Sequence, residues 1–280
     1  MTIKEILIEA QEKLSKKNIN SARLDAEVLL MYMLKKSKEW LYVNNDSELS
    51  TPQLKKYRKI IAERLKRKPV SYLINNKEFY GLDFYVNKDV LTPRPETEKL
   101  IELALTEILK TKGKLEIAEV GIGSGCISAV LAIELLKNKK NFYIYATDIS
   151  QKAIKVANIN LKKHKIKKYV KVKKEDILNT NSQFDFIISN PPYVPKRSKL
   201  EKELSFEPKQ ALFPNKGFIK KFLKSTLSHT KNGGYIFLEI DPSWKEEIVK
   251  LKKDDQIDKI LFEKDLKNLT RYTIIKKKLR

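Results

Sequence analysis

The spacing of apolar residues divides the chain into a helical part and a part in which strands alternate with helices. Over residues 1–67, apolar side chains recur every three or four positions, as Ile3 and Ile6 do, and this is the spacing of one helix face. Another such stripe follows Thr51 and Pro52, a pair that is typical of a helix start. We therefore expect a small helical bundle, and it contains no catalytic constellation.

The pattern changes at Pro69. The stretch from there to Leu91 is rich in aromatic and β-branched residues around Gly81, which predicts a hairpin that joins two domains. Further along, short apolar runs alternate with helical spacing, and this order predicts a doubly wound, mostly parallel, seven-stranded α/β sheet. The expected strands are 115–120, 142–147, 170–173, 184–189, 235–240, 257–263 and 272–276. Because only a short polar segment joins the last two, we expect them to form an antiparallel pair.

These patterns divide the chain into three regions. Residues 1–67 form a helical domain, residues 68–92 a connecting hairpin, and residues 93–280 the α/β domain. Since ligands of such sheets bind at the carboxyl ends of the strands, we expect the α/β domain to carry the chemistry.

Composition excludes several classes of protein. The chain has 280 residues, 41% of them hydrophobic, and no uninterrupted apolar run of the about 18 residues that a membrane-spanning helix needs. Its first residues mix acids with helical spacing and lack the apolar block of a signal peptide, so we expect a cytoplasmic protein. A single cysteine, Cys126, excludes an internal disulfide, and two distant histidines exclude an ordinary Cys/His metal cluster. We expect no bound metal.

The charge of the chain adds little to this picture. A formal net charge of +23 is compatible with ribonucleoprotein or acidic partners. However, the lysines are spread through almost every segment, and this bias could equally belong to a whole proteome. The charge therefore identifies no partner.

A glycine loop follows the first strand of the α/β domain. Glycines at this place let a ligand approach the backbone at the start of a helix. A dinucleotide fingerprint requires glycine at the position of Cys126, so the G-x-G-x-G spacing favours a different adenosine-containing ligand. The loop residues that we expect to bind it are Gly121, Ile122, Gly123, Ser124 and Gly125.

The ends of the next strands carry polar residues that suit the same ligand. Asp148 ends the second strand and is placed to bind ribose hydroxyls with both carboxylate oxygens. Asp176, just past the third strand, could accept from the exocyclic amine of adenine while Ile177 packs on the ring. Asn190 then ends the fourth strand. Because these strand ends meet in one crevice, we expect the residues to form one site.

The loop after the fourth strand, Ser189-Asn190-Pro191-Pro192-Tyr193, predicts the chemistry. The two prolines lack N–H donors and have a fixed φ, so they hold backbone carbonyls in one shape. The Asn190 side-chain oxygen and the Pro191 carbonyl could accept both N–H bonds of a planar NH2 group, which leaves its lone pair aimed at an electrophile. Tyr193 would flank the flat face of that group. We expect group transfer to an amide or aromatic amine nitrogen.

Taken together, these residues resemble class I S-adenosylmethionine-dependent amino-methyltransferases, and more closely the HemK-type family, the peptide chain release factor glutamine methyltransferases. The resemblance covers nearly the whole chain. The segments that carry it are RKPVSYLINNKEFYGLDFYV, VLTPRPETEKLIE, EVGIGSGCISAVLA, ATDIS, FDFIISNPPYV, FEPKQALF and NGGYIFLEI. The TPRPETE segment together with NPPY is the most specific part.

The resemblance implies a substrate and a donor. It implies that S-adenosylmethionine supplies a methyl group to the side-chain amide nitrogen, N5, of the glutamine in the Gly-Gly-Gln motif of release factors. Because residues 1–67 carry no chemistry and lie next to the TPRPETE segment, we expect them to dock the protein substrate. We also expect a monomer that binds neither membrane nor a specific nucleic-acid sequence. The implied substrate-binding residues are Asn190, Pro191, Pro192, Tyr193, Arg94 and Glu96.

The sequence departs from the family pattern at a few positions and leaves other substrates open. Asp241 and Trp244 stand where the family usually has Gly and Gln, Pro214 begins a segment that is usually richer in glycine, and Ile177 replaces a common aromatic residue. A glutamine in a ribosomal protein would fit the same chemistry. So would adenine N6 in DNA, which must be flipped out of the duplex. A non-catalytic RNA-binding protein is favoured only by the charge.

Overall fold

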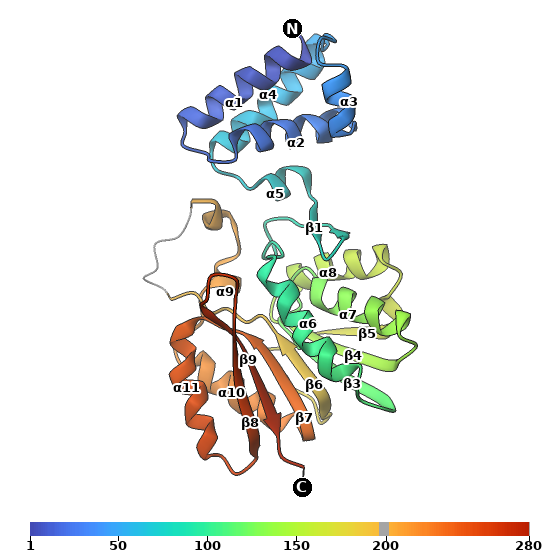
Figure 1. The fold of residues 1–280 in the computed structure, drawn as a ribbon, viewed down its shortest axis with the longest axis vertical. Coiled ribbons are helices and arrows are strands. Elements are labelled where there is room, and N and C mark those ends of the chain that lie inside the picture. The colour runs from blue at the N-terminus through green and yellow to red at the C-terminus, as the bar shows by residue number, and fades with distance from the viewer. Residues whose placement is uncertain (196–201, 280) are drawn as a thin grey trace. The chain divides into compact units, whose positions relative to one another are not determined.

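The computed structural model describes residues 1–195 and 202–279, which divide into two compact units (Figure 1). One unit, the helical unit, contains Met1–Asn76 and residues 202–206. The other, the α/β unit, contains the described residues from Lys77 onward apart from 202–206. The helical unit therefore reaches beyond residue 67 and includes a short segment from the far half of the chain.

Among its described residues, the helical unit contains five α-helices and the short 3-10 helix Lys202–Phe206. The apolar periodicity predicts only some of them. The α-helices are α1 (Ile3–Lys16), α2 (Ala22–Leu34), α3 (Lys38–Val43), α4 (Thr51–Leu65) and α5 (Val70–Ile74). Thr2 caps α1 in a capping box with Glu5, and Ser50 does the same for α4 with Gln53. The helix α5 corrects the expectation of strand structure just after Pro69. Helices α3 and α5 span only six and five residues, too few for a periodic signal to stand out.

Buried contacts hold the helical unit together. The Tyr57 hydroxyl is fully buried and donates to the carbonyl of Ala26 at 2.8 Å. The buried guanidinium of Arg64 donates to Asp25 at 2.7 Å and to Glu203 at 3.1 Å. Because a buried charge is costly unless it is paired, the contact with Glu203 explains why residues 202–206 belong to this unit.

The α/β unit begins with the expected hairpin. Strands β1 (Lys77–Phe79) and β2 (Leu82–Phe84) are antiparallel, and the turn between them places Tyr80 at φ 54° and Gly81 at φ 69°. Two consecutive left-handed residues are typical of the tight hairpin turn that matches strand twist. The Tyr80 N–H donates to Glu98 at 2.8 Å, which fastens the hairpin to the next helix.

A seven-stranded sheet forms the centre of the α/β unit, as the alternation of strands and helices predicts. Its strands are β3 (Lys114–Val120), β4 (Asn141–Asp148), β5 (Val170–Lys174), β6 (Phe184–Ser189), β7 (Thr230–Glu239), β8 (Ile257–Lys264) and β9 (Thr270–Lys277). Their order is β5-β4-β3-β6-β7-β9-β8. The strands β3 to β7 are parallel, and β9 is antiparallel to both of its neighbours.

Helices cover both faces of the sheet (Figure 1). The helices α6 (Glu96–Ile108), α7 (Cys126–Lys137) and α8 (Gln151–Lys163) pack in one apolar core, and α10 (Phe218–Ser228) and α11 (Lys245–Lys250) in another. Successive residues of one strand alternate between these cores: Phe186 and Ile188 of β6 lie in the first, and Ile187 in the second. This alternation is what a strand with two buried faces requires.

The topology fixes the position of a site. The chain moves outward from β3 to β5 and then returns to place β6 on the other side of β3. At this reversal the loops after β3 and β6 separate, which opens a crevice at the carboxyl ends of the strands.

In the described residues, no helix is long and apolar enough to span a membrane.

Candidate active site

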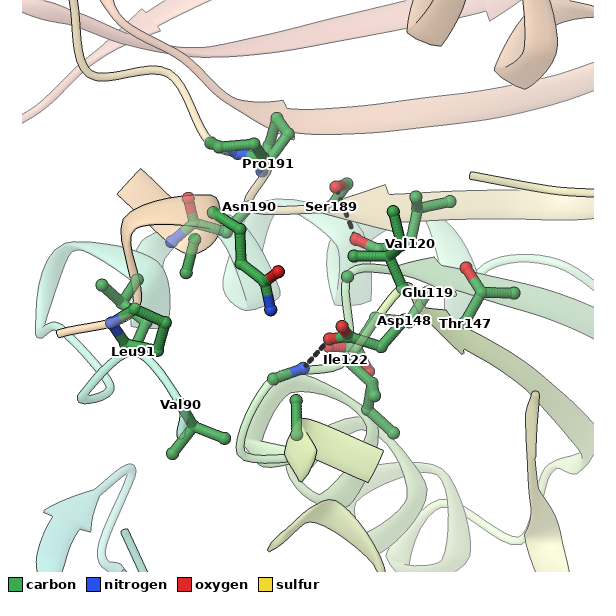
Figure 2. Close-up of a pocket in the computed structure, with 18 of the residues that line it drawn as sticks. Val90, Leu91, Glu119, Val120, Ile122, Thr147, Asp148, Ser189, Asn190 and Pro191 are labelled. Atoms are coloured by element: carbon green, nitrogen blue, oxygen red, sulfur yellow. Dashed lines mark hydrogen bonds between the residues drawn. The ribbon is translucent and has the colours of Figure 1, made fainter. Parts of the chain in front are cut away.

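A cavity of about 260 Å³ opens at the carboxyl ends of the strands, where the reversal predicts it (Figure 2). Its wall combines the loop after β3, the ends of β4 and β6, and the segment before α6. Figure 2 shows Asp148 and Asn190 facing the same space, with Val90 and Leu91 across from them. The expected residues that line this cavity are Gly121, Ile122, Gly123, Ser124, Asp148, Asp176, Ile177, Asn190, Pro191, Pro192 and Arg94.

The glycine loop has a backbone that other residues would not adopt. Gly121, Gly123 and Gly125 all have positive φ angles, of 80°, 52° and 82°, which strain any residue with a side chain. Gly125 also packs tightly, because a Cβ atom there would lie 3.3 Å from Cα of Ala157 in α8. The loop therefore brings its backbone to the edge of the cavity and leads directly into α7. Gly125 itself does not line the cavity and instead sets the distance between the helices.

Asp148 is fixed by backbone donors at the end of β4. One carboxylate oxygen accepts from the Gly123 N–H at 3.0 Å (Figure 2), and the other accepts from the Ser150 N–H at 2.8 Å. Burial raises the pKa of this carboxyl, and the two N–H donors oppose the rise. Each carboxylate oxygen has a second lone pair, so Asp148 can still accept from two hydroxyls of a ligand.

Asp176 and Ile177 lie beside each other on the cavity wall. Asp176 is exposed and pairs with Lys221 of α10 at 2.5 Å. Ile177 is buried and has φ 71°, an unusual angle for a β-branched residue. Its carbonyl accepts from the Thr147 hydroxyl at 2.6 Å, which holds it in place. Strained residues of this kind cluster at ligand sites.

Asn190 is held by a residue far away in the sequence. Its Nδ2 atom donates to the Thr97 hydroxyl of α6 at 3.0 Å. That hydroxyl in turn donates to the Glu239 carboxylate at the end of β7, at 2.8 Å. Within the described part of the chain, no hydrogen bond reaches the Oδ1 atom of Asn190. This oxygen is available to a ligand in the cavity, together with Pro191 and Pro192.

Two of the expected substrate-binding residues do not line the cavity. The Tyr193 hydroxyl donates to Glu239 at 2.6 Å, and its ring lies 5.8 Å from the Arg271 guanidinium. Glu96 is exposed at the first turn of α6. Arg94 does line the cavity, and its guanidinium donates to the buried Glu207 at 2.7 Å.

Three residues of the site have no role in the sequence-based prediction. Thr97 and Glu239 form the support of Asn190 just described, and Glu119 lines the cavity at the end of β3. Glu119 is 1% exposed and accepts from both the N–H and the hydroxyl of Ser128. Burial raises the pKa of Glu119 to about 8. The sequence offers one sign of a functional role for such residues, which is a polar residue at the end of an apolar strand. Glu119 and Glu239 have this position in the sequence, and Thr97 does not.

Comparison with known proteins adds a family to this geometry. Residues 5–74 match the model of the PrmC N-terminal domain, and residues 102–234 match that of the methyltransferase small domain. A release factor glutamine methyltransferase of Leptospira interrogans is 35% identical over 281 residues and covers 96% of each chain. One of Coxiella burnetii is 36% identical over 259 residues, which are 91% of this chain and 92% of that protein.

A solved structure agrees with the fold. A methyltransferase from Pyrococcus furiosus superposes with a TM-score of 0.52 over 73% of this chain and 92% of that chain, at 19% identity. Such a likeness concerns the arrangement of strands and helices and not the substrate.

Proposed function

Because this chain belongs to the release factor glutamine methyltransferase family, we infer that it methylates the side-chain amide nitrogen, N5, of the glutamine in the Gly-Gly-Gln motif of a peptide chain release factor. The methyl donor is S-adenosylmethionine. The observation that carries the inference is Asn190, whose Oδ1 atom is available at a cavity while its Nδ2 atom is held by Thr97.

The cavity fits the donor. Asp148 presents a fixed carboxylate for the ribose hydroxyls, and such bonds to a charged acceptor are stronger than neutral ones. Ile122 and Ile177 give an apolar wall for the adenine, and Asp176 lies next to Ile177 for the exocyclic amine. The glycine loop offers backbone that a ligand can approach closely. When bound, the donor supplies an electrophilic methyl group on a positively charged sulfur.

The loop after β6 suits a planar NH2 group. Among the described residues, no hydrogen-bond donor reaches Oδ1 of Asn190 or the carbonyl of Pro191, so both can accept from a ligand. An amide held by both N–H bonds keeps its plane fixed and turns the face of its nitrogen toward the methyl group. Because the nitrogen loses its proton during or after attack, no general base needs to act first.

The remaining assignments concern how the protein substrate is reached. We propose that residues 1–67 dock the release factor, and that Arg94, Glu96, Pro192 and Tyr193 belong to the surface that receives the glutamine loop. We also propose that the enzyme acts in the cytoplasm as a monomer.

Access to the cavity favours glutamine over adenine as the acceptor. A glutamine at the tip of a flexible loop can enter a narrow cavity, whereas adenine in a duplex must first be unstacked at a cost of a few kcal/mol.

The test uses labelled donor with four acceptors: an intact release factor, its Gly-Gly-Asn variant, a ribosomal protein fraction and duplex DNA. We expect label only on the intact release factor. Asparagine is one methylene shorter than glutamine, so its nitrogen does not reach the methyl group in line. Label on DNA or ribosomal protein, or equal label on the Gly-Gly-Asn variant, would overturn the assignment. Absence of donor binding in calorimetry would support a non-catalytic role.

A further inference from the structure

One buried carboxylate connects both ends of the loop that follows β6. Glu239 is 1% exposed at the end of β7. One of its oxygens accepts from the Thr97 hydroxyl at 2.8 Å, and the other accepts from the Tyr193 hydroxyl at 2.6 Å. Through Thr97 it is linked to Asn190 at 3.0 Å. The first and last residues of the Asn190–Tyr193 segment are thus fastened to the same group.

The direction of these hydrogen bonds follows from the number of protons. The hydrogen bonds from Tyr193 and Thr97 and the nearby Arg271 favour the ionised form of Glu239, and we take it as ionised. An ionised carboxylate only accepts, so both hydroxyls then give their protons to Glu239. A hydroxyl has one proton, and once Thr97 has donated it, the Thr97 oxygen can only accept. The partner of that oxygen on Asn190 must therefore be the NH2 end of the amide. The amide is then oriented with its Oδ1 atom toward the cavity.

Orientation matters because the two ends of an asparagine amide have nearly the same shape and opposite hydrogen-bonding character. With Oδ1 toward the cavity, Asn190 accepts from an NH2 group. In the flipped orientation it would present N–H bonds to that group and repel it.

The carboxylate that sets this orientation is buried at a cost in free energy. Burial raises the pKa of Glu239, while Tyr193, Thr97 and Arg271 oppose the rise.

We propose that Glu239 is a positioning residue that, through the Thr97 hydroxyl, fixes the flip state of the Asn190 amide and, through Tyr193, the far end of the same segment. The role rests on the proposed function, because it is the amide NH2 of the substrate that needs an acceptor at this point. Glu239 does not line the cavity, and the Thr97 hydroxyl on the cavity wall is engaged with Asn190 and Glu239. In this proposal their effect on the substrate is exerted through Asn190 and the segment that follows it.

The first test compares Thr97→Val with Thr97→Ser. Valine has nearly the shape of threonine without the hydroxyl, and serine keeps the hydroxyl without the methyl group. We expect Thr97→Val to lower kcat about tenfold to a hundredfold, as the loss of one preorganised polar group does, with donor Kd unchanged. Thr97→Ser should keep most of the activity. Equal activity of the two variants would show that the hydroxyl has no such role.

A double-mutant cycle separates positioning from packing. If Thr97 acts through the Asn190 side chain, Thr97→Val should cause no further loss of kcat once Asn190→Ala is present, since the group that it orients is gone. Additive losses would overturn the proposal. Glu239→Gln tests the carboxylate itself. The glutamine amide has nearly the volume of the glutamate side chain, but it can accept from one hydroxyl only and would donate to the other. We therefore expect kcat to fall.

A ground-state measurement keeps the inference testable apart from the substrate. In protein labelled with 15N at asparagine side chains, the NH2 resonance of Asn190 is identified by its loss in Asn190→Ala. We expect it to shift in Thr97→Val and in Glu239→Gln and to stay near its place in Thr97→Ser. An unmoved resonance in the first two variants would refute the network even if the enzyme is active. Inactive wild-type protein with shifted resonances would instead count against the proposed substrate.

Discussion

Asp148 shows how much of the site depends on single side chains placed by the backbone. Both of its oxygens already accept from N–H groups, of Gly123 and Ser150, so the carboxylate cannot rotate away from the cavity. Because the carboxylate is already fixed, it loses little conformational entropy when a ligand binds. A ligand that hydrogen-bonds to this carboxylate would therefore be bound more strongly than by a mobile surface acid.

Replacing Asp148 by alanine tests this directly. We expect Asp148→Ala to weaken S-adenosylmethionine binding by at least about tenfold, because two charge-assisted bonds to ribose are lost. A suitable control is Asp185→Ala, since Asp185 also accepts from a backbone N–H, that of Glu116 at 2.7 Å, but lies at the start of β6. Calorimetric titration of both variants decides the matter. Unchanged affinity of Asp148→Ala would remove this residue from the site.

The residues that sequence could and could not predict differ in a simple way. Asp148 and Asn190 end apolar strands and point to a shared crevice, so their position alone suggests a role. Thr97 lies 93 residues before Asn190 and 142 before Glu239, and threonine at the first turn of a helix is common for structural reasons alone. Only the folded sheet brings the three together.

At the level of secondary structure, the alternation of strands and helices was sufficient to predict the parallel part of the sheet. It was not sufficient for its edge: the expected antiparallel pair is present, but β9 is inserted between β7 and β8. The alternation of apolar and polar residues reports which face of a strand is buried and not which strand lies next to it. The short helix α5 was missed because Val70, Tyr72 and Ile74 also suit a strand.

The contact between α7 and α8 gives a prediction for Gly125. Gly125 and Gly113 have nearly equal φ angles, of 82° and 84°, but of the two only Gly125 has close neighbours, since a Cβ atom there would lie 3.3 Å from Ala157. Alanine at Gly113 should cost about 1 kcal/mol through its backbone angle. Alanine at Gly125 should cost about 1–3 kcal/mol more, because α8 must move. Denaturant unfolding of both variants measures the difference, and equal losses would show that α8 yields freely.

The two compact units of the chain carry different kinds of structure. The α/β unit contains the whole cavity, and the helical unit contributes no residue to its wall among the described residues. The helical unit nevertheless has a well-packed core of its own. A separate folded unit whose described residues do not line the cavity fits the proposed role in holding the protein substrate.

Removing residues 1–67, which are most of the helical unit, tests this division of labour. We expect the shortened protein to bind S-adenosylmethionine with unchanged affinity and to methylate a release factor at least about tenfold more slowly, since docking supplies the effective concentration of the glutamine loop. Donor titration and circular dichroism serve as the controls for folding. Full activity after truncation would place substrate recognition in the α/β unit.

The position of β9 has a consequence for how the enzyme comes into being on the ribosome. Synthesis proceeds from the N-terminus, so β3 to β7 emerge in an order that lets each strand find a partner already made. The outer edge of β7 cannot be covered by β8, which emerges next, because its place is taken by β9. Until β9 has been made, β7 is an open edge available to other nascent chains. Glu239 lies on β7 opposite Tyr272 of β9, so the strand that carries the support of Asn190 gains its outer neighbour only when this late strand enters the sheet.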